Sequence, residues 1–265
     1  MTDPTPERAA SSSAVEKMLA VLEAAVGATR FSSIVAATGL PKGTVHRILA
    51  ELSEHGYITP TERGEYAPGP KFLSLAGKAF ERLDISGIAK PFIDELGDQV
   101  ECTVHLGVLN GDEVIYVHRR DAAKAYRMPS RVGASVPLHS TAIGKAILTA
   151  FDDDAVRTYA VRTGLHPQTP RTITDAARLV GEVAEARERG FSMEREENVP
   201  GVACVAAPIT DHTGRVTHAV SVSTLAIEHT TQQMIAMAPR VIAAARAIEA
   251  ALGAPTTGGP TTDVE

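Results

Sequence analysis

Residues 39–58 read GLPKGTVHRILAELSEHGYI, and this stretch decides the expected fold of the first part of the chain. Gly39 is expected where two helices cross, because a residue without a side chain accepts the tight turn between them. Pro41 suits the first turn of the helix that follows, since its missing N–H would have no partner there, and Gly56 ends that helix. Four apolar residues repeat at helical spacing and should be buried: Val45, Ile48, Leu49 and Leu52. The stretch therefore predicts the turn and the second helix of a helix-turn-helix motif.

The segments on either side complete a winged helix. Residues 13–27 repeat apolar side chains in steps of three and four, which predicts an amphipathic helix. Its buried face should hold Val15, Met18, Leu19, Leu22 and Val26. A short helix follows, for which Ser32 or Ser33 offers the N-cap. The runs YITP, TERG and EYAP then predict a two-stranded hairpin that turns at Gly64. Three helices followed by a hairpin make residues 13–70 a winged helix-turn-helix domain.

The outward face of the second motif helix carries residues suited to DNA. At about 100° per residue, the side opposite Val45 holds small residues beside a histidine and an arginine, so the helix can approach base edges closely. Arg47 can bond guanine bidentately, and Lys42 or Thr44 can hold a phosphate. Arg63, at the hairpin tip, can reach a neighbouring groove. The predicted DNA contacts are Ser32, Ser33, Lys42, Gly43, Thr44, His46, Arg47 and Arg63.

This domain has no excess of basic residues of the kind that is common in DNA-binding domains. Residues 1–70 contain six Lys/Arg and eight Asp/Glu, and the whole chain has a formal net charge of −6. Acidic residues nevertheless avoid residues 31–50, where the predicted DNA contacts cluster. A single weakly charged domain would bind DNA poorly, so two copies on a palindromic operator are expected. A winged helix that recruits protein rather than DNA stays open as the alternative.

The composition is that of an ordinary globular protein, with 44% apolar and 22% charged residues among 265. Cys102 and Cys204 form neither a disulfide framework nor a CxxC pair, which suits a reducing cytoplasm. The polar start MTDPTPERAASSS is not a secretory signal, and no apolar run reaches the length needed to cross a bilayer. Residues 1–12 and 253–265 are expected to be disordered tails. The expectation is a cytoplasmic protein with no membrane partner.

Residues 84–252 mix strands with helices. Asn110-Gly111 lies between two β-runs and predicts a hairpin. VPLHSTAIGKAILTA passes from strand to turn to helix, and GVACVAAPI and VTHAVSVST predict two more strands. Residues 174–189 and 228–252 predict helices, and residues 71–83 predict a helix that links the two domains. Because the hairpins imply antiparallel pairing, the fold class expected for this domain is α+β.

The chain resembles the IclR family of bacterial transcriptional regulators from about Ser13 to Leu252. The resemblance rests on the opening stretch and YAPGPKFLSLA in the first domain. In the second domain it rests on RVGASVPLHSTAIGKAILTA and RERGFSMEREENVPGVACVAAPITDHTGRVTHAVSVST. It implies a winged helix-turn-helix, a linker helix and a GAF-like α+β effector domain. It also implies dimers or tetramers that bind an operator in double-stranded DNA, more often as repressors, and a small organic effector such as a carboxylic acid.

The resemblance also implies a set of effector contacts. In relatives that bind small oxo-acids these are amides of the TAxGK turn, an acidic residue, a cysteine and two alternating serines. Here the corresponding residues are Thr141, Ala142, Glu194, Cys204, Ser221 and Ser223. Elementary geometry supports part of the set, because Ser221 and Ser223 share a strand face and helix N-terminal amides favour anions. Asp is common where Glu194 stands, so the fit of the effector can differ here.

Rival chemistries find little support. STAIGKA lacks the leading glycine and the final Ser/Thr of a phosphate-binding loop, and no G-x-S-x-G elbow occurs. Cys204 lies in an apolar strand, where a small buried thiol is the simpler interpretation, and Cys102-x-x-His105 has no second metal-ligand pair. EREEN suggests a solvated face, with Glu196 and Glu197 outside any pocket. No catalytic residue, metal or cofactor is therefore expected. An α+β ligand-binding or enzymatic domain, with the winged helix used for protein recruitment, is the competing hypothesis.

Overall fold

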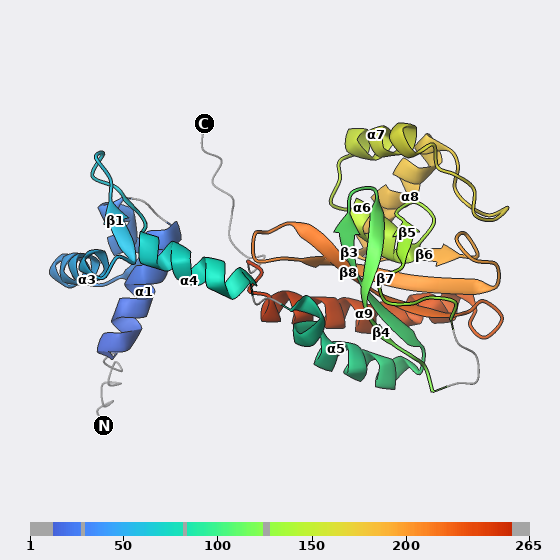
Figure 1. The fold of residues 1–265 in the computed structure, drawn as a ribbon, viewed down its shortest axis with the longest axis horizontal. Coiled ribbons are helices and arrows are strands. Elements are labelled where there is room, and N and C mark those ends of the chain that lie inside the picture. The colour runs from blue at the N-terminus through green and yellow to red at the C-terminus, as the bar shows by residue number, and fades with distance from the viewer. Residues whose placement is uncertain (1–12, 28–29, 82–83, 124–127, 256–265) are drawn as a thin grey trace, which may run out of the picture. The chain divides into compact units, whose positions relative to one another are not determined.

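The computed structural model describes residues 13–27, 30–81, 84–123 and 128–255, and these divide into two compact units between Leu83 and Asp84 (Figure 1). The N-terminal unit is helical with a small hairpin. Its elements are α1 (Ala14–Gly27), α2 (Phe31–Thr38), α3 (Lys42–Glu54), β1 (Ile58–Pro60), β2 (Tyr66–Pro68) and α4 (Pro70–Glu81).

Helices α2 and α3 form the predicted helix-turn-helix. Gly39 has φ +63° and ends α2 with its N–H on the Val35 carbonyl oxygen, so the turn uses the left-handed conformation that glycine accepts. The four apolar residues expected on α3 are buried and pack with Val21, Ala25, Ile34 and Ile58. The prediction of an N-cap at Ser32 or Ser33 is wrong: α2 begins at Phe31 after Arg30, and both serines lie exposed in its first turn.

The apolar face predicted for α1 is not the face that packs. Val15, Met18, Leu19 and Val26 are between 38% and 59% exposed, and of the predicted five only Leu22 contacts the core. The buried face is formed by Val21 and Ala25. Small side chains let α1 lie close to its neighbours, so the larger apolar residues are left on the outside.

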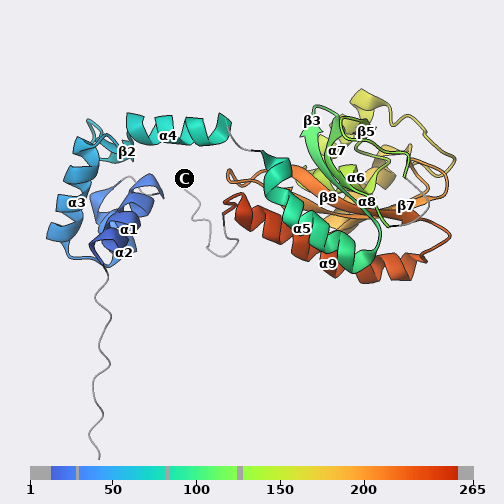
Figure 2. The same ribbon diagram turned by 60° about the horizontal axis from the view of Figure 1, so that its bottom comes forward.

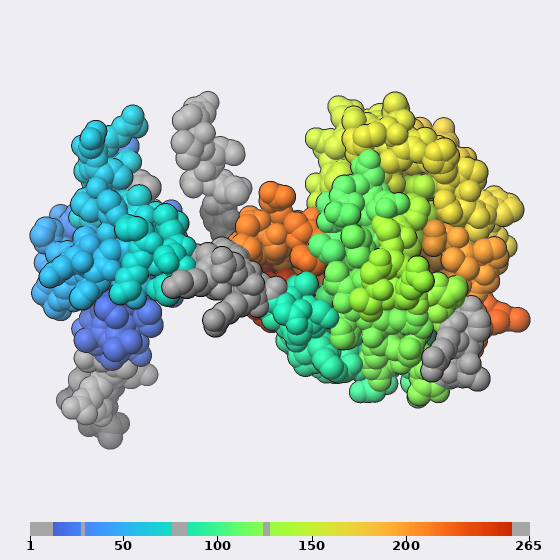
Figure 3. Space-filling view, in the orientation of Figure 1, coloured from blue at the N-terminus to red at the C-terminus, as the bar shows by residue number. Residues whose placement is uncertain are grey.

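The hairpin forms as predicted. Strands β1 and β2 pair antiparallel from Ile58↔Pro68 to Pro60↔Tyr66, and Gly64 takes φ +72° in the turn. The hairpin projects from the rest of the N-terminal unit (Figure 3). Helix α4 corresponds to the predicted linker helix, but it begins at Pro70 and ends at Glu81, and residues 82–83 lie outside the described part of the chain.

The C-terminal unit is the expected α+β fold. In the described part of the chain, six strands form one antiparallel sheet in the order β5-β4-β3-β8-β7-β6. The strands are β3 (Thr103–Asn110), β4 (Glu113–Arg120), β5 (Ser135–Pro137), β6 (Ser192–Arg195), β7 (Val202–Thr210) and β8 (Val216–Leu225). The helices are α5 (Ile85–Val100), α6 (Ala142–Leu148), α7 (Asp153–Thr163), α8 (Ala176–Arg189) and α9 (Thr231–Ala251).

Helices cover both faces of this sheet. Figure 2 shows α5 and α9 side by side across one face, while α6 packs on the other face with α8 and α7 beyond it. The face under α5 and α9 is mostly apolar and includes Val104, Leu106, Val205, Val220 and Val222. At its edge His118 of β4 lies 2.9 Å from the hydroxyl of Ser86 on α5. The opposite face carries polar side chains as well, and it is the face that bears the cavity described below.

Three elements of this unit have no counterpart among the sequence predictions: α5, α7 and β6. Helix α5 contains Gly87, Pro91 and Gly97, which weaken its local helical signal. The predicted tail also begins late, because Gly253 still donates its N–H to the Ala250 carbonyl oxygen after α9. The expected disorder of residues 1–12 and 256–265 lies outside the described residues.

Candidate functional site

The outward face of α3 is open. Lys42, Gly43, His46 and Arg47 are exposed and Thr44 is half-buried, and nothing lies within 4 Å of a Cβ placed on Gly43. This exposed face, with a glycine near its start, can enter a DNA groove as a recognition helix does. The imidazole of His46 meets the ring of Phe31 edge-on at 6.3 Å, so α2 orients this side chain.

The guanidinium of Arg47 forms an exposed ion pair that DNA could displace. Its Nη1 donates to Oε1 of Glu51, one turn further along α3, at 2.9 Å. Both side chains are at least half exposed, and an exposed i,i+4 ion pair is worth only about 0.3–0.5 kcal/mol. Arg47 can therefore exchange Glu51 for a base edge or a phosphate at little energetic expense.

The wing is tied to the start of α2. Arg30 forms an isolated antiparallel bridge with Glu65, and its Nε donates to the Glu65 carboxylate at 3.4 Å. Arg63 lies at the exposed tip of the hairpin, as predicted. The structure thus brings Lys42, Arg47 and Arg63 onto exposed parts of one unit.

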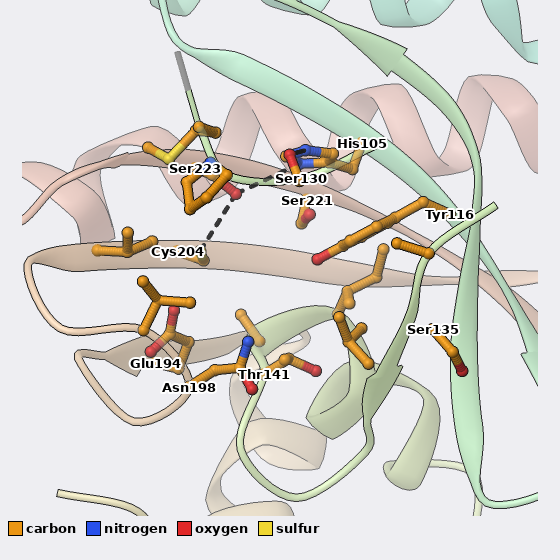
Figure 4. A pocket seen from close by; sticks show the side chains of 18 residues that line it. His105, Tyr116, Ser130, Ser135, Thr141, Glu194, Asn198, Cys204, Ser221 and Ser223 are labelled. Carbon is orange, nitrogen blue, oxygen red and sulfur yellow. Dashed lines mark hydrogen bonds between the residues drawn. The ribbon is translucent and has the colours of Figure 1, made fainter. Parts of the chain in front are cut away.

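A cavity of about 190 Å³ lies in the C-terminal unit, on the polar face of the sheet beside α6 (Figure 4). All six residues proposed as effector contacts line it, although they come from four separate segments. They are joined by groups that the sequence did not single out for this role. The additional polar lining residues are His105, Tyr116, Ser130, Ser135 and Asn198.

Strand pairing assembles one wall of the cavity. Glu194 pairs with Cys204, and Cys204 pairs with Ser223, so these side chains form a row across β6, β7 and β8. Ser221 lies two residues from Ser223 on the same face and pairs with His105 of β3. The thiol of Cys204 donates to Ser223 Oγ at 3.1 Å. The row forms because directly opposite residues in antiparallel strands point to the same face.

His105 continues this row to the far wall. Its Nδ1 lies 3.4 Å from Ser223 Oγ and its Nε2 lies 2.8 Å from Ser130 Oγ. Its ring stacks at 4.6 Å on Tyr116, whose hydroxyl reaches toward the middle of the cavity in Figure 4. Burial lowers the pKa of His105 to about 3, so the imidazole is neutral at physiological pH. Cys102 precedes His105 by three residues, points to the apolar face, and cannot form a ligand pair with it.

Thr141 and Ala142 begin α6 at the edge of the cavity. Thr141 is the N-cap, and its Oγ1 accepts the N–H of Gly144 at 3.1 Å and donates to the Pro137 carbonyl oxygen at 2.7 Å. The Thr141 side chain thus satisfies the amide of Gly144, which is not one of the two amides, those of Thr141 and Ala142, predicted to contact the effector. Gly144 is required for close packing, since a Cβ there would collide with the backbone of Leu138.

Glu194 is the acidic group of the cavity and is 3% exposed. Its Oε2 accepts the backbone N–H of Glu197 at 3.0 Å. Burial raises its pKa to about 7, because the charged carboxylate is desolvated more than that N–H compensates. Burial also raises the pKa of the Cys204 thiol well above its usual range, so Cys204 is a poor nucleophile in this state.

A buried ion cluster holds the connection between β6 and β7. The ammonium of Lys145, a residue with no exposed surface, lies 2.9 Å from the Glu197 carboxylate and 3.5 Å from that of Glu182 on α8. Ser140, in the turn before α6, donates to the side-chain oxygen of Asn198 at 3.0 Å and fixes the same connection. The prediction of a solvated face at Glu197 is wrong: this side chain is 13% exposed, although it lies outside the cavity as expected. The cause is its pairing with a lysine that is 52 residues away.

Other site types find no support in the described residues. They contain no group of three or more His, Cys, Asp or Glu side chains placed to hold a metal ion. Among the described helices there is none with the length and apolar character needed to cross a bilayer.

Comparisons with protein families agree over both units. Residues 14–62 match the IclR helix-turn-helix domain, and residues 77–250 match the model described as bacterial transcriptional regulator IclR C-terminal. The second match alone spans more than half of the chain.

Individual relatives lead to the same assignment. The chain is 33% identical to the HTH-type transcriptional regulator XynR of Escherichia coli over 82% of this chain and 86% of the relative. It is 34% identical to the E. coli DNA-binding transcriptional repressor YiaJ over 70% of this chain and 67% of that protein. The crystal structure of the Thermotoga maritima IclR aligns with a TM-score of 0.62 at 29% identity, covering 90% of this chain and 98% of that one.

Proposed function

The chain belongs to the IclR family of bacterial transcriptional regulators, whose members are DNA-binding proteins with an effector domain rather than enzymes, and from this premise we propose how its two units work. The N-terminal unit binds a palindromic operator through α3 and the wing. The C-terminal unit binds a small organic effector in the cavity beside α6. The protein acts in the cytoplasm as a homodimer or a pair of dimers. Repression is the favoured outcome, since YiaJ, one of its relatives, is named a repressor.

One observation carries the effector proposal. Thr141, Ala142, Glu194, Cys204, Ser221 and Ser223 were singled out from separate stretches of sequence, and all six line a single cavity. The cavity holds convergent polar groups on a largely apolar lining, which is the usual composition of a small-molecule site.

The DNA contacts are proposed to be Lys42, Thr44, His46 and Arg47 on α3 and Arg63 on the wing. The exposure of this face supports the proposal. Ser32 and Ser33 are exposed in the first turn of α2, where their hydroxyls and free N–H groups can meet a phosphate. Gly43 provides the space for close approach to the bases.

Dimerisation through α1 is proposed because of its exposed apolar residues. Val15, Met18, Leu19 and Val26 recur at helical spacing on the surface, and such a contiguous apolar stripe favours association with a second copy. Two linked recognition helices would compensate for the acidic charge of one unit. Effector binding then shifts the population between two arrangements of the dimer, and operator affinity changes only by the ligand's differential affinity for them.

The first test is binding of the purified protein to promoter DNA upstream of its own gene. We expect affinity to fall by several powers of ten between about 50 and 200 mM salt, as it does for proteins that make several phosphate contacts. Arg47→Ala should weaken binding by about 1–3 kcal/mol and relax one base position. Lys90→Ala is the matched control, because Lys90 also forms an exposed i,i+4 pair, with Asp94, and lies on α5. Equal binding by the Arg47 and Lys90 variants would remove Arg47 from the interface.

The second test adds a panel of small organic molecules to the same assay. A compound that shifts operator affinity in the native protein and loses its effect in Ser221→Val would support the cavity as the effector site. If no specific DNA binding occurs at any salt concentration, the winged helix would be better explained as a module that recruits protein.

A further inference from the structure

The charge of the cavity is concentrated in a single carboxyl group. Most polar groups on its wall are hydroxyls, a carboxamide, a thiol and a neutral imidazole. Among the described lining residues, Glu194 alone belongs to a residue type that carries charge at neutral pH, and no lysine or arginine lines the wall. An effector must therefore meet Glu194 without a matching cation from these residues.

Glu194 is held by neutral partners. Its Oε2 accepts the N–H of Glu197 at 3.0 Å, and Cys204 lies beside it on the neighbouring strand. Among the described residues, the buried ammonium of Lys145 is bonded instead to Glu197 and Glu182. The nearby cation is thus neutralised by two other carboxylates, and Glu194 has no ion-pair partner in the described part of the chain.

Several titratable groups face Glu194 from the elements packed around it. The charge of Lys145 favours the carboxylate, and that of Glu197 disfavours it. Burial exceeds both and raises the pKa of Glu194 to about 7, and His105 faces the same cavity as a neutral ring. The groups are Glu197 in the connection after β6, Lys145 on α6, Cys204 on β7, Tyr116 on β4 and His105 on β3.

Resting on the proposed function of the cavity, we infer that Glu194 selects the effector by charge: the cavity takes a ligand that is uncharged where it meets Glu194, and an anion enters only together with one proton. The favoured class is a small molecule with hydroxyl, carbonyl or amide groups. When an organic acid binds, the proton stays on the Glu194 carboxyl, which donates its O–H to an oxygen of the ligand.

The physical reason is the poor solvation of the site. Two carboxylates in contact within a buried space repel each other strongly, and one of them takes up a proton instead. A protonated Glu194 gains a hydrogen-bond donor that the carboxylate lacks. The row formed by Cys204, Ser223 and His105 provides further neutral donors and acceptors for the same ligand.

Cys204 offers a test that needs no knowledge of the effector. Its thiol lines the cavity, so a thiol reagent must enter the cavity to react. Three reagents share an ethyl methanethiosulfonate frame and carry a 2-hydroxy, a 2-sulfonato or a 2-trimethylammonio group. In each case the Cys204 thiolate attacks the reagent sulfur, a mixed disulfide forms and methanesulfinate leaves. Peptide mass spectrometry of the full-length protein separates Cys204 from Cys102, the other of the two cysteines.

The informative quantity is the rate ratio between charged and neutral reagents, because the ionisation of the thiol itself cancels in it. We expect the sulfonate-to-hydroxyl ratio to fall at least fivefold between pH 6 and pH 8 and the ammonium-to-hydroxyl ratio to rise. In Glu194→Gln both ratios should be independent of pH. If Glu194→Gln reacts with the neutral hydroxyl reagent within about twofold of the native rate, the cavity of the variant is intact. If that rate changes more, the inference is judged from the pH dependence of the two ratios in the native protein.

Two results would overturn the inference. They are ratios that do not depend on pH in the native protein and the same pH dependence in Glu194→Gln. The effector panel and the DNA assay distinguish this failure from failure of the proposed function. A regulator whose anionic effector binds equally well at pH 6 and pH 8 would keep the function and lose the charge selection.

Discussion

The two faces of the large sheet are formed by the same strands but differ in chemistry. Val220 and Val222 of β8 pack under α5 and α9, whereas Ser221 and Ser223 of the same strand face the cavity. The apolar face needs only volume and shape to be stable. The cavity face needs a partner for each polar group, and the described residues contain no buried side-chain N or O atom that lacks a hydrogen bond. Strand alternation thus lets one element serve packing and recognition together.

The strongest test of this contrast is Lys145 on the cavity side. Replacing Lys145 with Met should lower the free energy of unfolding by up to about 3 kcal/mol, because it leaves the partly buried Glu197 and Glu182 carboxylates without their buried cation. Urea denaturation of the full chain measures the change. The double variant Lys145→Met/Glu197→Gln should recover much of the loss. A single variant as stable as the native protein would show that the cluster is solvated.

The apolar face should respond to lost volume instead. Leu106→Ala is expected to cost about 2–5 kcal/mol in the free energy of unfolding, since Leu106 is fully buried against α5 and α9. Reactivity of Cys204 with the neutral thiosulfonate should stay near the native value, because the side chain lies across the sheet from the cavity. If Leu106→Ala also changed the rate at which Cys204 reacts with the neutral reagent, the two faces of the sheet would not be independent.

Glu194 should make stability depend on pH. Its folded pKa of about 7 lies above the value of 4.5 expected when it is exposed, so the folded state holds the proton more tightly. The free energy of unfolding should therefore fall as pH rises from 4.5 to 7, by on the order of 3 kcal/mol. Glu194→Gln should lack this component. Denaturation of the two proteins at several pH values gives the difference between their free energies of unfolding. A difference that does not change with pH would contradict the raised pKa of Glu194.

The smallest effect is expected at Ser223. Ser223→Ala removes the acceptor of the Cys204 thiol and a neighbour of His105, and such a loss costs about 0.5–1.5 kcal/mol of stability. Affinity for a cavity ligand, measured by calorimetry once a ligand is in hand, should fall by a larger amount. A variant that loses stability but binds normally would assign Ser223 to the packing of the sheet.

Local signals in the sequence were enough for several elements. Helix α3 followed from four apolar residues at helical spacing, and the hairpin of β3 and β4 followed from Asn110-Gly111, with Gly111 at φ +60° in the turn. The same local signals gave a wrong prediction for α1, where the larger apolar residues are exposed and Val21 and Ala25 are buried. Helix periodicity identifies a face but not which face finds a neighbour.

The sequence by itself determined the fold class, because turns and periodicity act within a few residues of the chain, and its resemblance to the IclR family indicated which residues could form a site. Only the tertiary structure decided that Glu194 meets no described cation, that Glu197 pairs with the buried Lys145, and that His105 and Tyr116 join the cavity. Burial, pKa and hydrogen-bond partners depend on groups brought together by strand pairing across long stretches of chain, and no local pattern records those neighbours.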